Sequence, residues 1–280
     1  PPAAPGPGNA HATSITIPMP SRNQSGLNFI ATARVIAIRS CKFVGNVGQR
    51  SSSVLSAILA TKLIVENCLF ENNSSEGGPA LSLSRSRAEI NNNVFRGNRA
   101  TIAFGGAVES GESQLNIRNN LFLRNSAGWN GGALFLYENT DSVENNTFIE
   151  NSVSSGQGGA ISLWAVQPGT GSIARNIFYR NQGYAIWQAN APFSFQGNDA
   201  YLNLPANYES ASILDSCSFS ADPQFCDSSA GQYSLFDSSP CLPSNSSCGN
   251  LIGAYGVGCV RLSVLSVSTD GIQHHIHTVS

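Results

Sequence analysis

The chain has 280 residues, a formal net charge of −2 and 11% charged residues, against roughly 25% in an ordinary soluble domain. A balance this close to neutral does not favour nucleic acid or an anionic membrane surface as a partner. No run of about 18 apolar residues occurs, so the sequence predicts no membrane span. Ser, Asn, Gly and Thr carry most of the polar character instead.

Four regions are predicted in chain order. A Pro/Gly-rich segment covers residues 1–12, and a repetitive region covers 13–203, beginning with an alternating stretch at 13–17. A Cys-rich, irregular segment at 204–259 is predicted to be a disulfide-stapled cap, because the open end of a repeat array exposes unpaired backbone and apolar core. Residues 260–280 alternate again, which predicts a C-terminal strand or hairpin that lies on its own solenoid or adds to the edge of a neighbouring subunit.

The repetitive region carries a motif of fixed period, in which Phe-x-x-Asn alternates with Gly-Gly. The phenylalanines lie 27, 25, 27, 26 and 30 residues apart, at Phe43, Phe70, Phe95, Phe122, Phe148 and Phe178. The asparagines follow at Asn46, Asn73, Asn98, Asn125, Asn151 and Asn181. The glycine pairs are Gly77/Gly78, Gly105/Gly106, Gly131/Gly132 and Gly158/Gly159. A period of this size indicates stacked, equivalent structural units.

Each repeat reads as two or three short strands without a helix. Leu115 and Ile117 alternate with polar neighbours, and so do Ala133 and Phe135, a pattern typical of strands with one buried face. The sequence therefore predicts an all-β fold, a right-handed parallel β-helix with about 26 residues per turn, in which each strand pairs with its equivalent one turn later. The phenylalanines would then stack inside, the asparagines would form an amide ladder, and Gly-Gly would make a corner that a Cβ would block.

Seven cysteines favour disulfides and an oxidising, extracellular setting. Cys41 and Cys68 occupy the same place in adjacent repeats, where they are either disulfide-bonded or stacked as reduced buried thiols. In the cap, Cys241–Cys248 and Cys226–Cys259 are candidate pairs, which would leave Cys217 over. Five sequons are glycosylation candidates, at Asn23, Asn72, Asn73, Asn145 and Asn245.

The Gly-Gly-Ala-[Val/Leu/Ile] tetrads at 105–108, 131–134 and 158–161, with the Phe-x-x-Asn motifs, resemble the repeats of chlamydial polymorphic outer-membrane proteins. They look equally like secreted bacterial proteins with right-handed parallel β-helix, pectate-lyase-like repeats. Residues 221–226 and the Cys- and Gly-containing segments up to Cys259 are similar to the tail that often closes such proteins. The resemblance implies the fold and is nearly silent on activity.

Pectate-lyase-like enzymes use clustered carboxylates for calcium and an Arg or Lys as base, so we looked for such a cluster. Glu109 and Glu112 flank one Gly-Gly corner, and Glu138 and Asp141 occupy the matching loop one turn later. We interpret them as solvated loop charges, with a calcium site or acid/base pair as the alternative. We predict no metal site and no cofactor. His274, His275 and His277 fit a solvated strand end better than a closed zinc site.

Aromatic residues could form a sugar-stacking face, although we expect them to fill corners and the late core; they are Trp129, Trp164, Trp187, Tyr137 and Tyr184. The leading hypothesis is a non-enzymatic structural or adhesive protein, extracellular or on the cell surface. Such a protein could assemble with itself into a filament through heterologous ends. The alternative is a polysaccharide-binding or polysaccharide-cleaving protein on the same scaffold. A third hypothesis is a passenger fragment of a larger surface protein.

Overall fold

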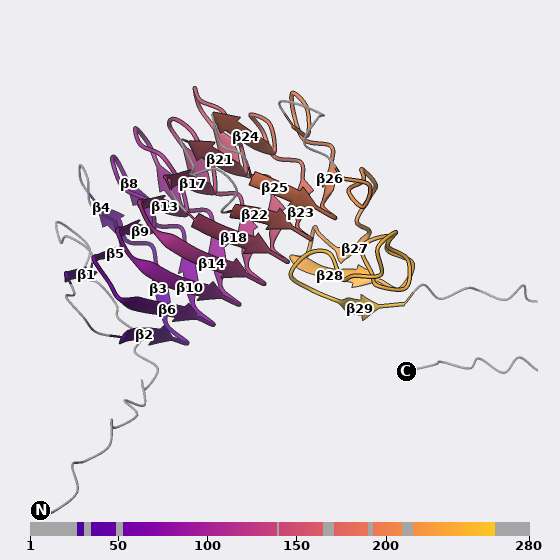
Figure 1. The fold of residues 1–280 in the computed structure, drawn as a ribbon, viewed down its shortest axis with the longest axis horizontal. Coiled ribbons are helices and arrows are strands. Elements are labelled where there is room, and N and C mark those ends of the chain that lie inside the picture. The colour runs from indigo at the N-terminus through magenta and orange to yellow at the C-terminus, as the bar shows by residue number, and fades with distance from the viewer. Residues whose placement is uncertain are drawn as a thin grey trace, which may run out of the picture.

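The computed structural model describes residues 27–30, 35–48, 53–138, 140–164, 171–189, 193–208 and 215–260, without the side chains of 27–30 and Asp141. The predicted strands at 13–17 and 260–280, the sequon at Asn23 and the three C-terminal histidines lie outside these ranges, apart from Val260. The described chain is an all-β parallel solenoid of about 8 turns. Figure 1 shows its strands in rows along the long axis, from the indigo first turn to the yellow C-terminal strands.

Four parallel sheets make up the coil, and each turn visits them in the order B, C, A, D. Sheet B contains β1 (Leu27–Ile30), β5 (Leu55–Ile58), β9 (Leu81–Ser84), β13 (Val108–Gly111), β17 (Leu134–Tyr137), β21 (Ile161–Trp164) and β24 (Ile186–Ala189). Sheet C contains β2 (Val35–Arg39), β6 (Lys62–Glu66), β10 (Arg87–Asn91), β14 (Gln114–Arg118), β18 (Thr140–Glu144), β22 (Gly171–Ala174) and β25 (Phe193–Gln196).

The other two sheets have shorter strands. Sheet A contains β3 (Lys42–Val44), β7 (Leu69–Glu71), β11 (Val94–Arg96), β15 (Leu121–Leu123), β19 (Thr147–Ile149), β23 (Ile177–Tyr179) and β26 (Asp199–Tyr201). Sheet D contains β4 (Val47–Gly48), β8 (Ser74–Ser75), β12 (Arg99–Ala100), β16 (Ser126–Ala127) and β20 (Ser152–Val153). The described residues contain no helix, and so none with the length and hydropathy of a membrane span.

The interior is a column of phenylalanine rings stacked along the axis of the coil. Successive ring centroids from Phe43 to Phe178 are 4.7, 4.7, 5.0, 4.7 and 5.0 Å apart, and each pair of rings is close to parallel. The strand register places each Phe opposite the next one, as in Phe95 opposite Phe122. All six rings are buried, so burial and ring stacking stabilise the same column.

Two amide ladders run beside this column. At the corner between sheets A and D, each Asn donates its amide and its backbone N–H to the Oδ1 of the Asn on the next turn, from Asn46 to Asn203. A second ladder with the same pattern lies at the corner between sheets C and A, from Asn93 to Asn198. The ladders satisfy amides that would otherwise be buried without partners.

The Gly-Gly pairs at 105/106, 131/132 and 158/159 form the corner that leads into sheet B, whereas neither glycine of the pair Gly77/Gly78 has a positive φ. Gly131 has a φ of +72°, a backbone conformation that favours glycine. A Cβ on Gly132 would overlap the carbonyl oxygens of Gly159 and Ser152 on the next turn. The first glycine thus provides the left-handed turn, and the second allows successive turns to approach each other.

Cys41 and Cys68 are free, buried thiols, so the prediction of a disulfide between them is wrong and the alternative of stacked thiols holds. The backbone N–H of Cys41 donates to the Sγ of Cys68 at 3.4 Å, and the two thiols donate to carbonyl oxygens of their own turns. In turn, Cys68 donates its backbone N–H to Asn93 Oδ1 at 2.8 Å. The thiols therefore extend the second ladder, and a disulfide would remove both S–H donors.

The Cys-rich segment contains two disulfides, Cys217–Cys248 and Cys226–Cys259. The pair Cys226–Cys259 is as predicted, whereas Cys241–Cys248 and a leftover Cys217 are wrong. Cys241 is fully buried against the solenoid, where its thiol lies 3.3 Å from Asp199 Oδ2. That contact holds Cys241 in the interface, so Cys248 pairs with Cys217 instead.

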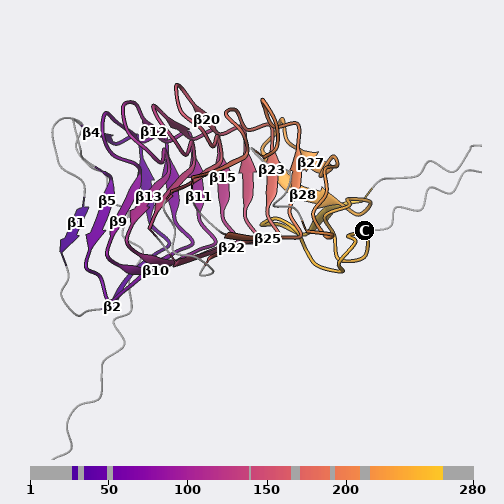
Figure 2. The same ribbon diagram turned by 45° about the horizontal axis from the view of Figure 1, so that its top comes forward.

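Part of this segment closes the coil, and part of it lies along one side. Bridges from Gln182 to Leu204 and from Ile186 to Tyr208 continue the ladder past the last full turn. The small sheet E, which contains β27 (Phe225–Asp227), β28 (Gln232–Phe236) and β29 (Val257–Cys259), belongs to the part beside sheet A (Figure 2). Side chains of sheet E and of the loops around it share an apolar cluster with the outer face of sheet A: Leu121, Leu123, Ile149, Ile177 and Tyr179 pack with Tyr233, Leu235, Leu242 and Ile252.

Candidate functional site

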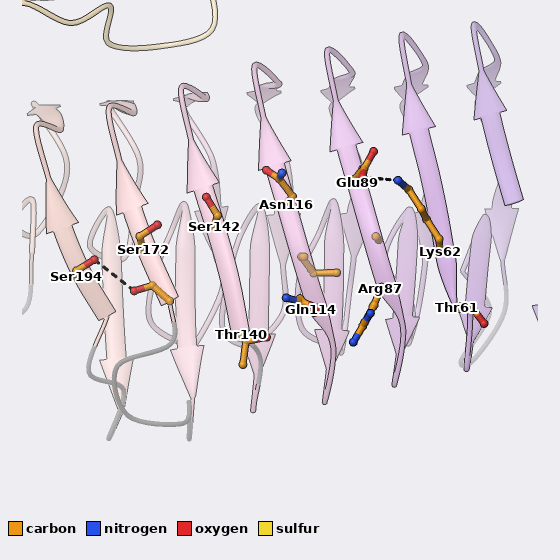
Figure 3. Close-up of a pocket in the computed structure, with 13 residues that line it drawn as sticks. Thr61, Lys62, Arg87, Glu89, Gln114, Asn116, Thr140, Ser142, Ser172 and Ser194 are labelled. Atoms are coloured by element: carbon orange, nitrogen blue, oxygen red, sulfur yellow. Dashed lines mark hydrogen bonds and ion pairs between the residues drawn. The ribbon is translucent and has the colours of Figure 1, made fainter. Parts of the chain in front are cut away.

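The outer face of sheet C is hollowed by a groove of about 690 Å³ that crosses strands β6, β10, β14, β18, β22 and β25. Residues alternate along each strand, so that in β14 Leu115 is buried inward while Gln114 and Asn116 face outward. Figure 3 shows the outward side chains in two rows across the strands. One row holds Glu89, Asn116, Ser142, Ser172 and Ser194, and the other holds Lys62, Arg87, Gln114 and Thr140, with Thr61 beside Lys62 at its end.

The first row places one hydrogen-bonding side chain on each turn from β10 to β25, whereas Ile64 occupies the same position on β6. Glu89 is opposite Asn116, which is opposite Ser142, and the register continues through Ser172 to Ser194. Neighbouring strands lie roughly 4.8 Å apart, so the row is a ladder of polar groups at that interval. The serines leave the floor of the groove low at its C-terminal end, where bulkier side chains would fill it.

Charge is confined to the other end of the groove. Lys62 Nζ lies 2.7 Å from Glu89 Oε1, so these two charges compensate each other. Arg87 is exposed in the row between Lys62 and Gln114, and in the described part of the chain no carboxylate pairs with it. A guanidinium presents five N–H donors in a rigid plane, so Arg87 is available to a ligand in the groove.

Asn116 provides an acceptor at the middle of the groove. Its Oδ1 is buried and has no hydrogen-bond partner among the described residues. A buried polar atom left unpaired costs about 1–3 kcal/mol relative to a satisfied one. Because this oxygen is closed off from the groove, the Asn116 side chain would have to turn outward for it to accept a hydrogen bond from a ligand hydroxyl or amide N–H and recover that free energy.

A second cavity of about 490 Å³ adjoins the groove at the corner between sheets B and C, and Thr61, Arg87, Gln114 and Thr140 line both. Its rim carries the ion pair between Arg85 Nε and Glu112 Oε2, 3.0 Å apart. Both side chains are largely exposed, so this pair adds little to stability. Together the two cavities form a polar surface that continues from the corner across sheet C.

The four predicted acidic residues do not form one cluster. Glu112 and Glu138 line the corner cavity, whereas Glu109 belongs to sheet B, opposite Ser82 and Phe135 of the neighbouring strands. The side chain of Asp141 lies outside the described part. Within that part, no group of three or more His, Cys, Asp or Glu residues could hold a metal ion. Burial raises the pKa of the Glu109 carboxyl to about 7.

The sequons differ in the freedom of their amides. Asn73 is buried within the first ladder. The amide of Asn145 donates to Leu251 O at 2.7 Å, and that of Asn245 donates to Asp237 O and Ser239 O at 3.0 and 2.9 Å. Asn72 is exposed, at a corner with a φ of +52°. Among the described sequons, Asn72 offers the most accessible amide.

Aromatic side chains are more exposed than expected from the sequence. Trp129, Trp164 and Tyr137 are 54%, 41% and 38% exposed, so the expectation that they fill corners and the late core is wrong for these three. Trp187 and Tyr184 are half-buried. The exposed rings lie on or beside the outer face of sheet B, away from the floor of the groove.

The family comparison agrees with this geometry. Residues 24–200, more than half of the chain, match the family model described as "Right handed beta helix region". The chain belongs to this family. A search of curated proteins found no match. Membership in the right-handed β-helix family specifies the scaffold, and the chemistry must be argued from the outward-facing residues of this chain.

Sequence reasoning missed the groove residues Arg87, Gln114, Asn116, Ser142 and Ser172. The signal for them was present in the alternation, because each lies at an outward position of a strand in sheet C. Reading those positions as columns across the repeats would have collected the same polar side chains. The columns alone do not predict that the surface between the two rows is hollowed into a groove.

Proposed function

We propose that this β-helix is an extracellular adhesive protein that binds an extended polysaccharide along the groove of sheet C. The observation that carries the proposal is the row of polar side chains from Glu89 to Ser194, with one on each turn. A polymer of repeated, hydroxyl-bearing units can make the same kind of contact on successive turns. Asn116, whose amide is a half-buried polar group in the middle of this row, adds hydrogen-bonding capacity to the floor of the groove.

Other polymers suit the groove less well. Nucleic acid binding depends on many cationic contacts to phosphates, whereas the groove offers Arg87 and a Lys62 already paired with Glu89. A peptide adding to a sheet needs a free edge, whereas the groove lies on the face of a seven-stranded sheet. Hydroxyl, amide and a single cation favour a carbohydrate.

An extracellular location is part of the same proposal. Two disulfides close the Cys-rich segment, and such bonds persist in oxidising compartments. The likeness of the Gly-Gly-Ala tetrads to repeats of chlamydial surface proteins also favours display at a surface. End-to-end assembly into a filament is a further element, and electron microscopy of the concentrated protein tests it: fields containing only isolated monomers would remove assembly from the proposal.

Binding without cleavage is favoured over catalysis. The described residues that line the groove include one carboxylate, Glu89, and it is paired with Lys62. Glycoside hydrolysis ordinarily uses two carboxyl groups that flank the scissile bond. The polysaccharide-cleaving alternative is tested by incubating the protein with polyuronates, with and without calcium, and following the ultraviolet absorbance of unsaturated products. Their appearance would replace the adhesive assignment with a lyase.

Affinity electrophoresis tests binding directly, in native gels that contain neutral or acidic polysaccharides. We expect at least one polysaccharide to retard the wild-type protein, and R87A and N116A to reduce the retardation. R99A is the matched control, because Arg99 is an exposed arginine of β12 on sheet D. Retardation that is equal in the wild-type protein, R87A and N116A would contradict the assignment to this groove.

A further inference from the structure

An aromatic strip runs along the outer face of sheet B and the loops that lead into it. It consists of Trp129, Phe104, Phe135, Trp164 and Trp187, each in contact with the next. Phe104 stacks on Phe135 at 4.4 Å, and the rings of Trp164 and Trp187 meet edge to face at 6.2 Å. Tyr137 adjoins the strip in register with Trp164. The strip crosses several turns and follows the axis of the coil.

All three tryptophans of the chain lie in this strip. Two of them, Trp129 and Trp164, are 54% and 41% exposed although an interior column of apolar residues is available to the fold. Large apolar side chains exposed together in a row mark a binding surface more often than isolated ones do. Tryptophan and tyrosine suit such a surface because each joins an apolar ring to a polar atom.

Polar groups without partners are set among the rings. The carboxyl of Glu109 is half-buried one strand before Phe135, on the same outward column, and no described residue forms an ion pair or hydrogen bond with it. Ser162 follows Phe135 in that column, and its buried Oγ also has no partner. The described part of the column contains no Lys or Arg.

We propose that the aromatic strip is a second carbohydrate site, which binds a neutral saccharide chain by stacking sugar rings on Trp129 and Trp164 and hydrogen-bonding a sugar hydroxyl to Glu109. This site is distinct from the groove on sheet C and does not depend on the function proposed for it. A sugar offers an apolar ring face and hydroxyl groups in the same unit, and the strip presents the complement of both.

The alternative occupants fit the strip less well. An apolar protein surface laid over it would bury the Glu109 carboxyl without a partner, which is costly. Stable protein interfaces also bury about 800 Å² on each partner, whereas this feature is a row flanked by Ser82, Ser84 and Ser56 of the preceding turns. Above about pH 7, where the Glu109 carboxyl is ionised, an anionic glycan would place its charge next to this carboxylate without a cation to compensate it. A neutral glycan can give the Glu109 carboxyl a hydrogen-bond partner and brings no second negative charge next to it.

Intrinsic tryptophan fluorescence provides a direct test, because every tryptophan reports from the strip. The probes are cellohexaose, mannohexaose and chitohexaose, with a hexameric oligogalacturonate as the acidic comparison. We expect at least one neutral hexasaccharide to change the emission saturably and the acidic one to have no effect. Calorimetry should show that W164A loses about tenfold or more in affinity, that W164F retains most of it, and that R99A, which alters an exposed arginine of sheet D, binds as the wild-type protein does.

E109A should weaken binding, and E109Q should restore part of it because the amide keeps a hydrogen-bonding oxygen. Circular dichroism confirms that each variant is folded. The absence of a saturable change with all three neutral probes would overturn the proposal. So would equal affinity of W164A and wild type, or an emission that shifts with protein concentration alone, which would identify a contact between copies. Loss of binding in R87A with full binding in W164A would assign the ligand to the groove instead.

Discussion

The amide ladder predicts that one substitution has very different effects at two equivalent positions. Asn125 lies in the interior of the first ladder, where its Nδ2 donates to Phe95 O at 2.9 Å and Asn151 Oδ1 at 3.0 Å. Its Oδ1 accepts the backbone N–H of Asn98 at 3.0 Å and the amide of Asn98 at 2.9 Å. Asn46 begins the described ladder, and its amide makes one such bond, to Asn73 Oδ1 at 2.8 Å.

Asn125→Ala would leave two buried donors of Asn98 unpaired. Each unpaired buried group costs about 1–3 kcal/mol, so the variant should lose about 2–6 kcal/mol, a large part of the roughly 5–15 kcal/mol that stabilises a domain. Asn46→Ala removes one hydrogen bond, and Asn73 Oδ1 keeps the backbone N–H of Asn46 at 3.0 Å. The expected loss there is about 0.5–1.5 kcal/mol.

The assay is urea unfolding followed by circular dichroism, with the two midpoints compared under the same conditions. Because a solenoid can unfold in parts, each transition is followed separately. Asn125→Asp adds a matched-size test: burial should raise the pKa of the new carboxyl in the folded state, so the variant should lose stability as the pH rises above about 4. Equal midpoints for Asn125→Ala and Asn46→Ala would refute the reasoning that interior amides satisfy their neighbours.

Three further predictions concern other groups of the molecule. Burial raises the pKa of Asp199 to about 7; the stability contributed by its protonated form is therefore lost as the pH rises from about 4 through 7, and D199N should flatten the fall in Tm across that range relative to wild type. Cys41 and Cys68 should resist alkylation in the folded protein and react in urea, and a disulfide-linked peptide containing both would contradict this. Secreted from a eukaryotic host, the folded protein should carry glycan on Asn72 and none on the buried Asn73, which glycopeptide mass spectrometry can check.

The interior of the fold could be predicted from the sequence because the coil stacks each residue on its equivalent. Phe95 and Phe122 recur at the repeat period, and the register places them opposite each other. The same rule placed Cys41 and Cys68 on adjacent turns but left their bonding open. The outcome depends on the ladder, in which Cys68 Sγ takes the acceptor position that an Asn Oδ1 takes on later turns.

The Cys-rich segment was harder to predict because no period constrains it. Its disulfides follow from where the segment folds back against sheet A, where residues far apart in the sequence, such as Ile177 and Ile252, belong to one apolar cluster. Buried Cys241 lies beside Asp199 in that interface, and Cys217 is therefore the partner of Cys248. Local pattern carries no information on such a long-range contact.

The two candidate sites illustrate why outward columns are less predictable than inward ones. An inward position must match its neighbours above and below, so Phe follows Phe for six turns. An outward position in sheets B and C is free of that requirement, and Glu109, Phe135 and Ser162 succeed one another in a single column. Identity along a column therefore indicates the demands of the fold, and variation along a column indicates where a ligand can be recognised.

Because the interior is built independently of the outer surface, the scaffold can present side chains to a polymer at a regular spacing. The turns repeat at the spacing of paired strands, roughly 4.8 Å, so outward groups on successive turns stand at a regular interval that the core enforces. Because the phenylalanine stack and the two amide ladders fix that interval independently of the surface, Asn116 or Trp164 can be replaced without disturbing it. The variants proposed for the groove and the strip therefore test recognition and leave the coil intact, whereas Asn125→Ala tests the coil itself.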